Sequence, residues 1–413
     1  MNVYFFKLCW KNIWRNRRRT FITVNAIGLG VMSLVFLRNY YDSFHDQLIQ
    51  NVIKYHSGHL AISARKFEEN NATHLFISDV GGIRRWLRDQ VGVVAVSERV
   101  VFSGLASSAR GSTTVGVMGV KPEEESQVTQ FAKKIVSGTF FSEMKPRSIV
   151  LGSKVAATLG VELGSKIVLL TQGVDGSVGN ELFFVTGVFD TNSDADRSLA
   201  FIQLEEGRDL ISLPKDSVHQ VAVVLKNDDL VGEIRRDFDD FFKQHSKIQM
   251  LSWKELQRPV VAMIELDRAV NRLLMFLILG VAALGIANSI LMSIMERTRE
   301  FGVMLAIGTA RRDVVKMVVV ETLLLTVVGV LVGNLLGILV TVFFNQVGFD
   351  LRWLTSKDFV VQGAIVQTVS YPVVRVMNSL VVSGVIMGLA LVVSFFPARH
   401  AGSLTPMKAL RSY

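Results

Sequence analysis

Four long apolar segments constrain the fold of this chain more than any other feature. A segment of roughly 20 apolar residues can cross a bilayer as a helix. Such segments run over residues 20–37, 273–294, 317–344 and 377–396. The polar block of residues 42–268 separates the first segment from the second. The pattern predicts an α-helical membrane protein with four transmembrane helices and a large α+β extracytoplasmic domain inserted between helices 1 and 2.

The charge is distributed unevenly, and this distribution predicts the orientation. The net charge is +9, but residues 42–268 hold 26 Lys/Arg and 30 Asp/Glu, which gives −4. The remainder holds 19 Lys/Arg and 6 Asp/Glu, which gives +13. Because basic loops stay in the cytoplasm, we expect a multi-pass membrane protein with both termini cytoplasmic and the large domain on the outer side of the membrane. The same placement accounts for the basic pI without a nucleic-acid partner.

These signals divide the chain into nine expected segments. They are a cytoplasmic amphipathic interfacial helix (1–19), transmembrane helix 1 (20–41), the extracytoplasmic domain with stalk ends (42–268), transmembrane helix 2 (269–294), a cytoplasmic coupling-helix loop (295–316), transmembrane helix 3 (317–344), an extracytoplasmic loop (345–376), transmembrane helix 4 (377–396) and a cytoplasmic tail (397–413).

The first segment has a helical pattern of its own. Phe5, Cys9 and Ile13 are four residues apart, and Phe6, Trp10 and Trp14 repeat the same spacing, opposite Lys7, Lys11 and Arg15. A basic amphipathic helix of this kind lies in the membrane interface, where tryptophan is favoured. A simple orientation signal is the alternative.

The loop between the second and third spans predicts a partner site. It reads MERTREFGVMLAIGTARRDV, a short basic helix with apolar residues spaced for one face. We expect this helix to contact a cytoplasmic partner through nine residues: Glu296, Arg297, Arg299, Glu300, Phe301, Leu305, Gly308, Arg311 and Arg312.

The inserted block mixes strand and helix signals. Strand-like runs cover residues 59–63, 93–104, 113–120, 166–172, 181–189 and 219–225, and helix-like runs cover 79–90, 153–159 and 229–245. This favours an α+β domain of two parts. Its ends continue the adjacent spans at helical spacing, through Phe44, Leu48, Val261 and Ile264, and would form a stalk.

One loop of the block has two interpretations. Residues 172–181 (QGVDGSVGNE) join two strand runs, and their glycines and Asp175 suit either an ordinary turn or a projecting hairpin that meets a soluble partner. The partner interpretation involves six residues: Gly173, Val174, Asp175, Gly176, Ser177 and Val178.

No catalytic or cofactor motif stands out. The seven histidines do not match HExxH, and neither GxSxG nor GxxxxGK[ST] occurs. We therefore expect a non-catalytic subunit with no metal and no cofactor of its own. Inside the third span, Glu321 would snorkel or pair with Arg311 or Arg312. Gly329, Gly333 and Gly337 form a small-xxx-small pattern for close helix packing.

Several motifs now resemble a known family. They are RNRRRT before the first span, MERTREFGVMLAIGTARRDV, VETLLLTVVGVLVGNLLG in the third span and PARHAGSLTPMKALR at the end. Together with the order of spans, they resemble the permeases of MacB-like (type VII) ABC transporters, which carry an FtsX-like membrane module. The segments GLGVMSLVFLRNYYDSFHDQLIQNVI and VGVMGVKPEEE are similar to the lipoprotein-releasing LolC/LolE type.

The resemblance implies a place in the bacterial inner membrane, with the large domain in the periplasm, and it also implies partners and a mechanism. A cytoplasmic ABC ATPase dimer would bind ATP and Mg²⁺ and grip the loop helix of each of two permease chains, identical or related. The first two spans and their stalk would enclose a cavity for lipoprotein anchors, bounded by Phe36, Tyr40, Phe44, Leu48, Val261 and Ile264. A periplasmic carrier would collect the released lipoprotein at the hairpin, although this loop lacks the family's proline. MacB-like efflux of small molecules or peptides and FtsX-like control of an envelope hydrolase are the alternatives.

Overall fold

The computed structural model describes residues 3–55, 58–141, 146–191, 193–243, 247–350 and 369–402. These residues form two compact units. The membrane unit combines the residues up to 46 with those from 265 onward, and the inserted domain comprises residues 47–264. Residues 403–411 of the motif PARHAGSLTPMKALR and most of the loop between the third and fourth spans lie outside the described residues.

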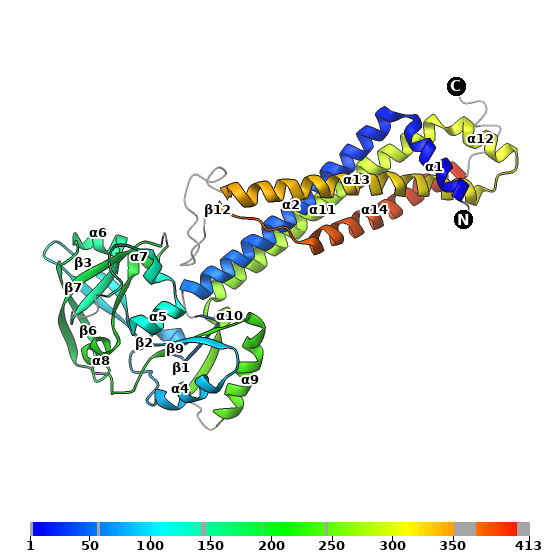
Figure 1. Cartoon of the computed structure of the whole chain (residues 1–413). Helices are drawn as coiled ribbons and strands as arrows, with labels where there is room; N and C mark the ends of the chain where they lie inside the picture. Colours follow the sequence, from blue (N-terminus) through cyan, green and yellow to red (C-terminus); the bar gives the residue numbers. More distant parts are fainter. Residues whose placement is uncertain are drawn as a thin grey trace. The chain divides into compact units, whose positions relative to one another are not determined.

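Helices make up the membrane unit (Figure 1). The four long ones are α2 (Arg17–Tyr55), α11 (Arg258–Glu296), α13 (Arg311–Val347) and α14 (Val376–Gly402), and each contains a window apolar enough to cross a membrane. The short ones are α1 (Val3–Arg15) and α12 (Thr298–Ala306), and a two-stranded ribbon pairs β11 (Phe349–Asp350) with β12 (Val369–Ser370). The four predicted spans are therefore confirmed as helices.

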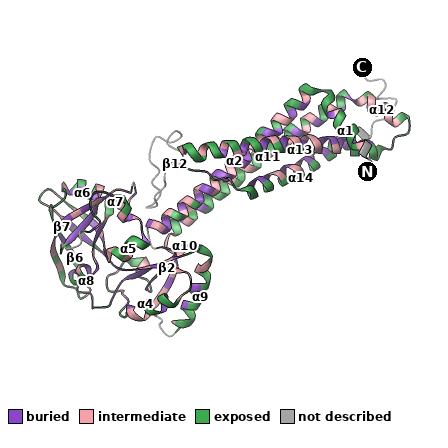
Figure 2. Cartoon of the chain, viewed as in Figure 1, coloured by how far each residue is buried: buried purple, intermediate pink, exposed green. Residues whose placement is uncertain are grey.

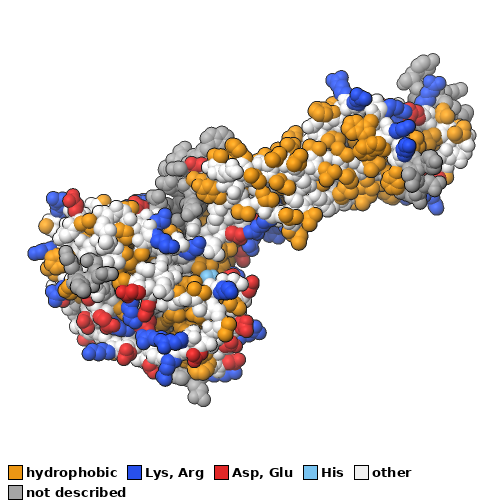
Figure 3. All heavy atoms as spheres, in the orientation of Figure 1, with side chains coloured by type: hydrophobic (Ala, Val, Ile, Leu, Met, Phe, Trp, Pro, Cys, Tyr) orange, Lys and Arg blue, Asp and Glu red, His pale blue; other side chains and the backbone are white. Residues whose placement is uncertain are grey.

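The stalk prediction is confirmed as secondary structure. Helix α2 continues without a break from its apolar part to Tyr55, and α11 begins at Arg258, well before its apolar part. The surface of the membrane unit is mostly apolar, and Lys and Arg side chains gather at the end that carries α1 and α12 (Figure 3). We call this end the α12 end.

The glycines of α13 pack against α2, as their spacing predicts. A Cβ atom added at Gly329 would lie 2.7 Å from the Ile27 side chain. One at Gly333 would lie 2.6 Å from both the Gly28 carbonyl oxygen and Val31 Cβ. The two backbones can approach this closely only because glycine has no side chain.

Helix α1 divides its apolar residues between two environments. Cys9 is buried in the core of the membrane unit and Ile13 is also buried, whereas Phe6, Trp10 and Trp14 are each more than two-fifths exposed. The single broad face expected from the sequence is thus two stripes. The first holds α1 on the bundle, and the second leaves Trp10 and Trp14 exposed. Their place in the headgroup region stays a prediction.

A single ten-stranded sheet organises the inserted domain. Several of its strands are coloured as buried in Figure 2. The spatial order is β10–β1–β9–β2–β3–β8–β5–β7–β4, with β6 joining β2 to β7. The strands are β1 (Leu60–Ala64), β2 (Val93–Ser107), β3 (Ser112–Val120), β4 (Ile135–Gly138), β5 (Ser148–Gly152), β6 (Lys166–Gln172), β7 (Val178–Phe189), β8 (Leu199–Gln203), β9 (Gln220–Leu225) and β10 (Ile248–Ser252).

The predicted two parts share this sheet and have separate cores. One core packs α4 (Val80–Asp89) and α9 (Val231–Phe241) on β1 and β9, with Ile62, Trp86 and Phe238 buried. The other packs α6 (Ser153–Leu159) and α8 (Leu204–Leu210) on β2, β3 and β5. Shorter helices are α3 (Phe67–Asn70), α5 (Pro122–Val128), α7 (Ala195–Ser198) and α10 (Trp253–Leu256), with 3₁₀ turns at Phe131–Lys134 and Asp228–Leu230.

Candidate functional site

The loop between α11 and α13 forms the predicted helix, α12, and ends it with a glycine. Gly308 has a φ of +99°, which favours glycine. The Gly308 N–H donates to the Leu305 carbonyl at 3.2 Å, and the Thr309 N–H donates to the Met304 carbonyl at 2.9 Å. This pair of backbone hydrogen bonds forms a Schellman motif. Gly308 therefore terminates the helix and does not extend its apolar face as the sequence suggested.

A buried ion pair anchors α12 to α13. The Arg297 guanidinium donates to both carboxylate oxygens of Glu321, at 2.7 and 3.0 Å, and only 6% of each residue is exposed. Arg297 also donates to Glu300 at 2.9 Å and lies 5.1 Å above the Phe301 ring. Phe301 is itself buried. The expected pairing of Glu321 with Arg311 or Arg312 is wrong, because Arg297 occupies its carboxylate.

The same network includes the N-terminal segment. The Asn12 amide donates to Glu321 at 2.7 Å, Arg15 pairs with Glu300, and Arg19 pairs with Glu296 at 3.1 Å. The N-terminal segment and the loop between α11 and α13 thus meet at one charge cluster. We define the anchor network as Asn12, Arg15, Arg297, Glu300 and Glu321.

The remaining predicted residues of the loop face outward. Glu296, Arg299, Gly308, Arg311 and Arg312 are exposed, and Glu300 and Leu305 are half-buried. Two apolar side chains that the prediction omitted are also exposed: Val303 at 45% and Ile307 at 78%. We define the tip surface as Arg299, Val303, Ile307, Arg311 and Arg312. Its combination of apolar and arginine side chains is typical of protein interfaces.

A second polar cluster joins α2 to the start of α14. The Asn378 amide donates to Asn39 at 2.9 Å and to Asp42 at 2.8 Å, and Asn39 and Asn378 are buried. Arg375 pairs with Asp46, and His45 lies 2.7 Å from Asp267 of α11. The sequence did not predict these pairs, because the two members of each pair are far apart in the chain.

The residues expected to bound a lipid cavity fall into two groups. Phe36, Tyr40 and Phe44 form an aromatic row along α2, and Phe36 and Tyr40 also contact Phe349. Within the inserted domain, Leu48 and Ile264 are buried and Val261 is half-buried. A role for these residues in binding lipid stays a prediction.

The loop between β6 and β7 is a short, closed turn. The Val174 N–H donates to the Ile211 carbonyl at 2.8 Å, and Gly173 donates to the Ser177 carbonyl at 2.8 Å. The Asp175 carboxylate accepts the Ser177 N–H at 3.0 Å, and Gly176 has a φ of +84°. Val178, which follows the turn, is 72% exposed. The turn lies against Ile211, and partner binding there stays a prediction.

Among the described residues, no group of three or more His, Cys, Asp or Glu side chains could hold a metal ion.

Comparison with known proteins identifies the family. Residues 20–241 match the MacB-like periplasmic core domain, and residues 272–406 match the FtsX-like permease C-terminal domain. The chain belongs to the MacB-like permease family. Its resemblance to this family, inferred from the motifs, is confirmed, as is the architecture of four spans with a large domain between the first two. The chain is an ABC transporter permease subunit.

Three relatives illustrate the range of this permease family. The chain is 24% identical to the lipoprotein-releasing system transmembrane protein LolC of Neisseria meningitidis, over 95% of this chain and 94% of that protein. It is 22% identical to LolE of Haemophilus influenzae over the full length of both chains. It is 22% identical to the macrolide export ATP-binding/permease protein MacB of Nitrosomonas europaea, over 98% of this chain and 59% of that protein.

Proposed function

We propose that this permease releases lipoproteins from the outer leaflet of the bacterial inner membrane, driven by a separate ATPase. The observation that carries the proposal is the end-to-end similarity to two lipoprotein-releasing proteins, which spans both sequences in each comparison. The proposed assembly contains an ATPase dimer, which binds ATP and Mg²⁺, and a second permease chain. Both termini of the permease would face the cytoplasm, and the inserted domain would face the periplasm.

The composition of the tip surface supports the proposal that the ATPase binds there. Ile307 is more than three-quarters exposed beside Arg311 and Arg312, where charged residues make insertion into the hydrocarbon core costly. An exposed apolar side chain with exposed arginines four and five residues further along the chain suits an interface with a soluble protein. In this assembly α12 is the coupling helix.

The anchor network supports mechanical transmission from the coupling helix. Arg297 and Glu321 fix α12 on α13, and α13 is packed against α2 through Gly329 and Gly333. A push on α12 would move these three helices as one piece, because close-packed interfaces yield little. The cargo would then be released from the membrane surface without crossing the bilayer.

Native mass spectrometry of the complex purified gently from its own membranes tests the function. The expected species contains two ATPase chains, two permease chains and a triacylated protein. A complex with an adaptor and no lipidated cargo would refute lipoprotein release and favour export, which the similarity to MacB also allows. A stably bound cell-wall hydrolase would favour regulation, in line with the FtsX-like domain.

A charge reversal tests the tip surface. Arg299 is exposed, and among the described residues it has no ion pair, so Arg299→Glu leaves the anchor network intact. We expect this variant to lose at least tenfold in permease-stimulated ATPase activity, while Arg18→Glu, an exposed reversal at the same end, changes it less than twofold. Equal stimulation by the Arg299→Glu variant and the wild type would exclude the tip surface as the docking site.

A further inference from the structure

Helix α1 carries lysines and tryptophans together on its exposed side. Lys7, Trp10, Lys11 and Trp14 follow the spacing i, i+3, i+4 and i+7, which places them on one face of the helix. All four residues are exposed, and the rings of Trp10 and Trp14 lie 6.0 Å apart in an edge-to-face arrangement. We call these four residues the Lys/Trp face. It combines the charges of two lysines with an aromatic surface.

The positive charge of the Lys/Trp face is not balanced by nearby carboxylates of the same segment. Residues 1–19 contain six Lys or Arg and no Asp or Glu. Arg15 and Arg19 are paired, as described above, whereas Lys7 and Lys11 form no ion pair among the residues that the structure describes. An anionic partner would therefore complement this face, at the end of the membrane unit where Lys and Arg gather (Figure 3).

The opposite side of α1 fixes the position of the helix on the membrane unit. Asn12 donates to Glu321 at 2.7 Å, and the buried Cys9 belongs to the core of this unit. Glu321 lies four residues after Met317, where the apolar segment of α13 begins. These contacts place α1 at the border between the apolar part of the bundle and its charged end. In a bilayer, this border corresponds to the level of the phospholipid headgroups.

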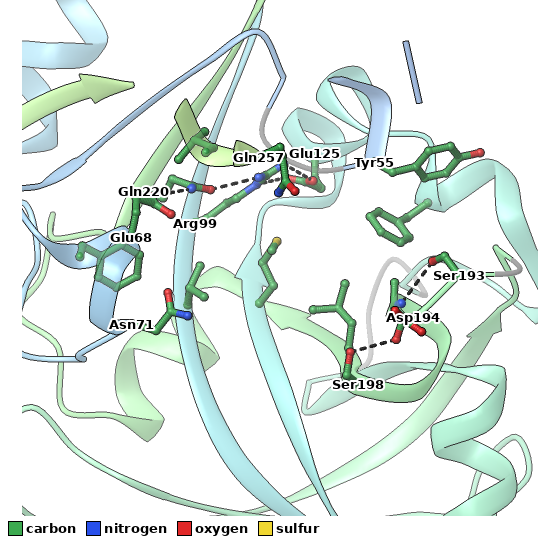
Figure 4. Close-up of a pocket in the computed structure, with 17 residues that line it drawn as sticks. Tyr55, Glu68, Asn71, Arg99, Glu125, Ser193, Asp194, Ser198, Gln220 and Gln257 are labelled. Carbon is green, nitrogen blue, oxygen red and sulfur yellow. Dashed lines mark hydrogen bonds and ion pairs between the residues drawn. The ribbon is translucent and has the colours of Figure 1, made fainter. Parts of the chain in front are cut away.

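A cavity in the inserted domain contains an arginine that is, by contrast, already paired. The cavity has a volume of about 310 Å³, and Arg99 is the one cationic side chain among the described residues that line it (Figure 4). Arg99 donates to both oxygens of the buried Glu125 carboxylate, at 3.0 Å from Nε and 2.7 Å from Nη2. A bidentate pair of this kind satisfies both charges. The charge of Arg99 is therefore not available to an anionic ligand, unlike the charges of Lys7 and Lys11.

We infer that the Lys/Trp face of α1 is a binding site for anionic phospholipids of the membrane leaflet around it. The Lys7 and Lys11 ammonium groups contact headgroup phosphates, and the Trp10 and Trp14 rings lie at the level of the glycerol groups, which tryptophan favours. A bilayer surrounds the membrane unit at this level, which favours lipid over a soluble protein as the occupant. A zwitterionic lipid binds less well, because its own cation repels the lysines. The inference does not depend on which cargo the permease releases.

Quenching of tryptophan fluorescence by brominated lipids tests the site on the full chain in phosphatidylcholine nanodiscs. The quenchers are phosphatidylglycerol and phosphatidylcholine, each brominated in the upper part of one acyl chain and present at the same low fraction. The signal from α1 is the quenching that is lost in the double variant Trp10→Phe/Trp14→Phe. Each basic side chain near an anionic surface strengthens binding about fivefold, so we expect phosphatidylglycerol to bind at least about tenfold more tightly than phosphatidylcholine. High salt should reduce this preference.

Matched variants locate the site. The double variant Lys7→Gln/Lys11→Gln should reduce the preference for phosphatidylglycerol to about threefold or less, because it removes both lysine charges from the face. The control Lys154→Gln/Lys166→Gln removes the same charge from exposed positions of the inserted domain, and it should keep the preference of the wild type. Unfolding in SDS checks that each variant is folded.

Three results would overturn the inference. Absence of quenching of Trp10 and Trp14 by either lipid would show that the face does not meet the bilayer, as when a soluble protein covers it. Equal binding of the two lipids would show that the lysines do not select an anionic headgroup. An unchanged preference in Lys7→Gln/Lys11→Gln would place the selectivity elsewhere on the membrane unit.

Discussion

Replacing Gly333 with alanine tests the packing of α13 on α2. The new Cβ would lie 2.6 Å from Val31 Cβ and from the Gly28 carbonyl oxygen, whereas ordinary contact begins at 3.4 Å, so the helices must separate locally by about 0.8 Å. Overpacking of this size costs about 1–3 kcal/mol. The higher helix propensity of alanine returns at most ~1 kcal/mol. We therefore expect a net loss of about 1–2 kcal/mol in the free energy of unfolding.

The matched control is Gly384→Ala on α14, where nothing lies within 4 Å of the added Cβ. Without a clash, this variant should be as stable as the wild type or slightly more stable. The assay is reversible unfolding of the purified chain by SDS in mixed micelles, followed by circular dichroism. If Gly333→Ala unfolds at the same SDS fraction as Gly384→Ala, then α13 does not pack on α2 through this glycine, and the reasoning fails.

Three further perturbations test other features. Glu321→Met should destabilise the chain by about 3 kcal/mol, because Arg297 loses its buried carboxylate partner and keeps only the partly exposed Glu300. The double variant with Arg297→Met should recover most of that loss in SDS unfolding, and additive losses would contradict the pairing. Asn378→Ala should cost about 1 kcal/mol in the same assay, because it removes a buried hydrogen bond to Asn39, and no change would show that the bond does not stabilise the fold. Burial lowers the pKa of His219 below 6.5, so the unfolded state binds more protons in acid, and the stability of the inserted domain should fall as the pH drops below 6.5. Near-UV circular dichroism at pH 7 and pH 5 follows this loss of stability. If His219→Gln shows the same pH dependence as the wild type, His219 does not cause the loss.

The sequence predicts long periodic elements well and short buried ones poorly. The strand runs at residues 93–104 and 166–172 correspond to β2 and β6, and the latter shows the alternating burial of a half-exposed strand. Strands β5 and β8, by contrast, were not predicted. Each has five residues with no polar alternation, because most of their side chains are buried on both faces.

The helix at the candidate site was predicted in position, but its contacts with the neighbouring helices were not. The composition of the loop at residues 295–316 correctly indicates a short basic helix, because charge and apolar spacing are local properties. The division of its residues into anchor network and tip surface depends on the neighbouring helices. Arg297 reads like Arg299 in the sequence, yet only the former meets Glu321, since that contact requires the approach of α13.

Strand β2 has a consequence for how the inserted domain carries load. It is 15 residues long, which corresponds to about 50 Å of extended chain. Its first half pairs with β9 in one part of the domain, and its second half pairs with β3 and β6 in the other. One continuous strand therefore links the two parts, in addition to the side-chain contacts between them. Tension applied to either part passes along peptide bonds to the other, so the domain should be pulled apart by force only when the hydrogen bonds of this strand shear.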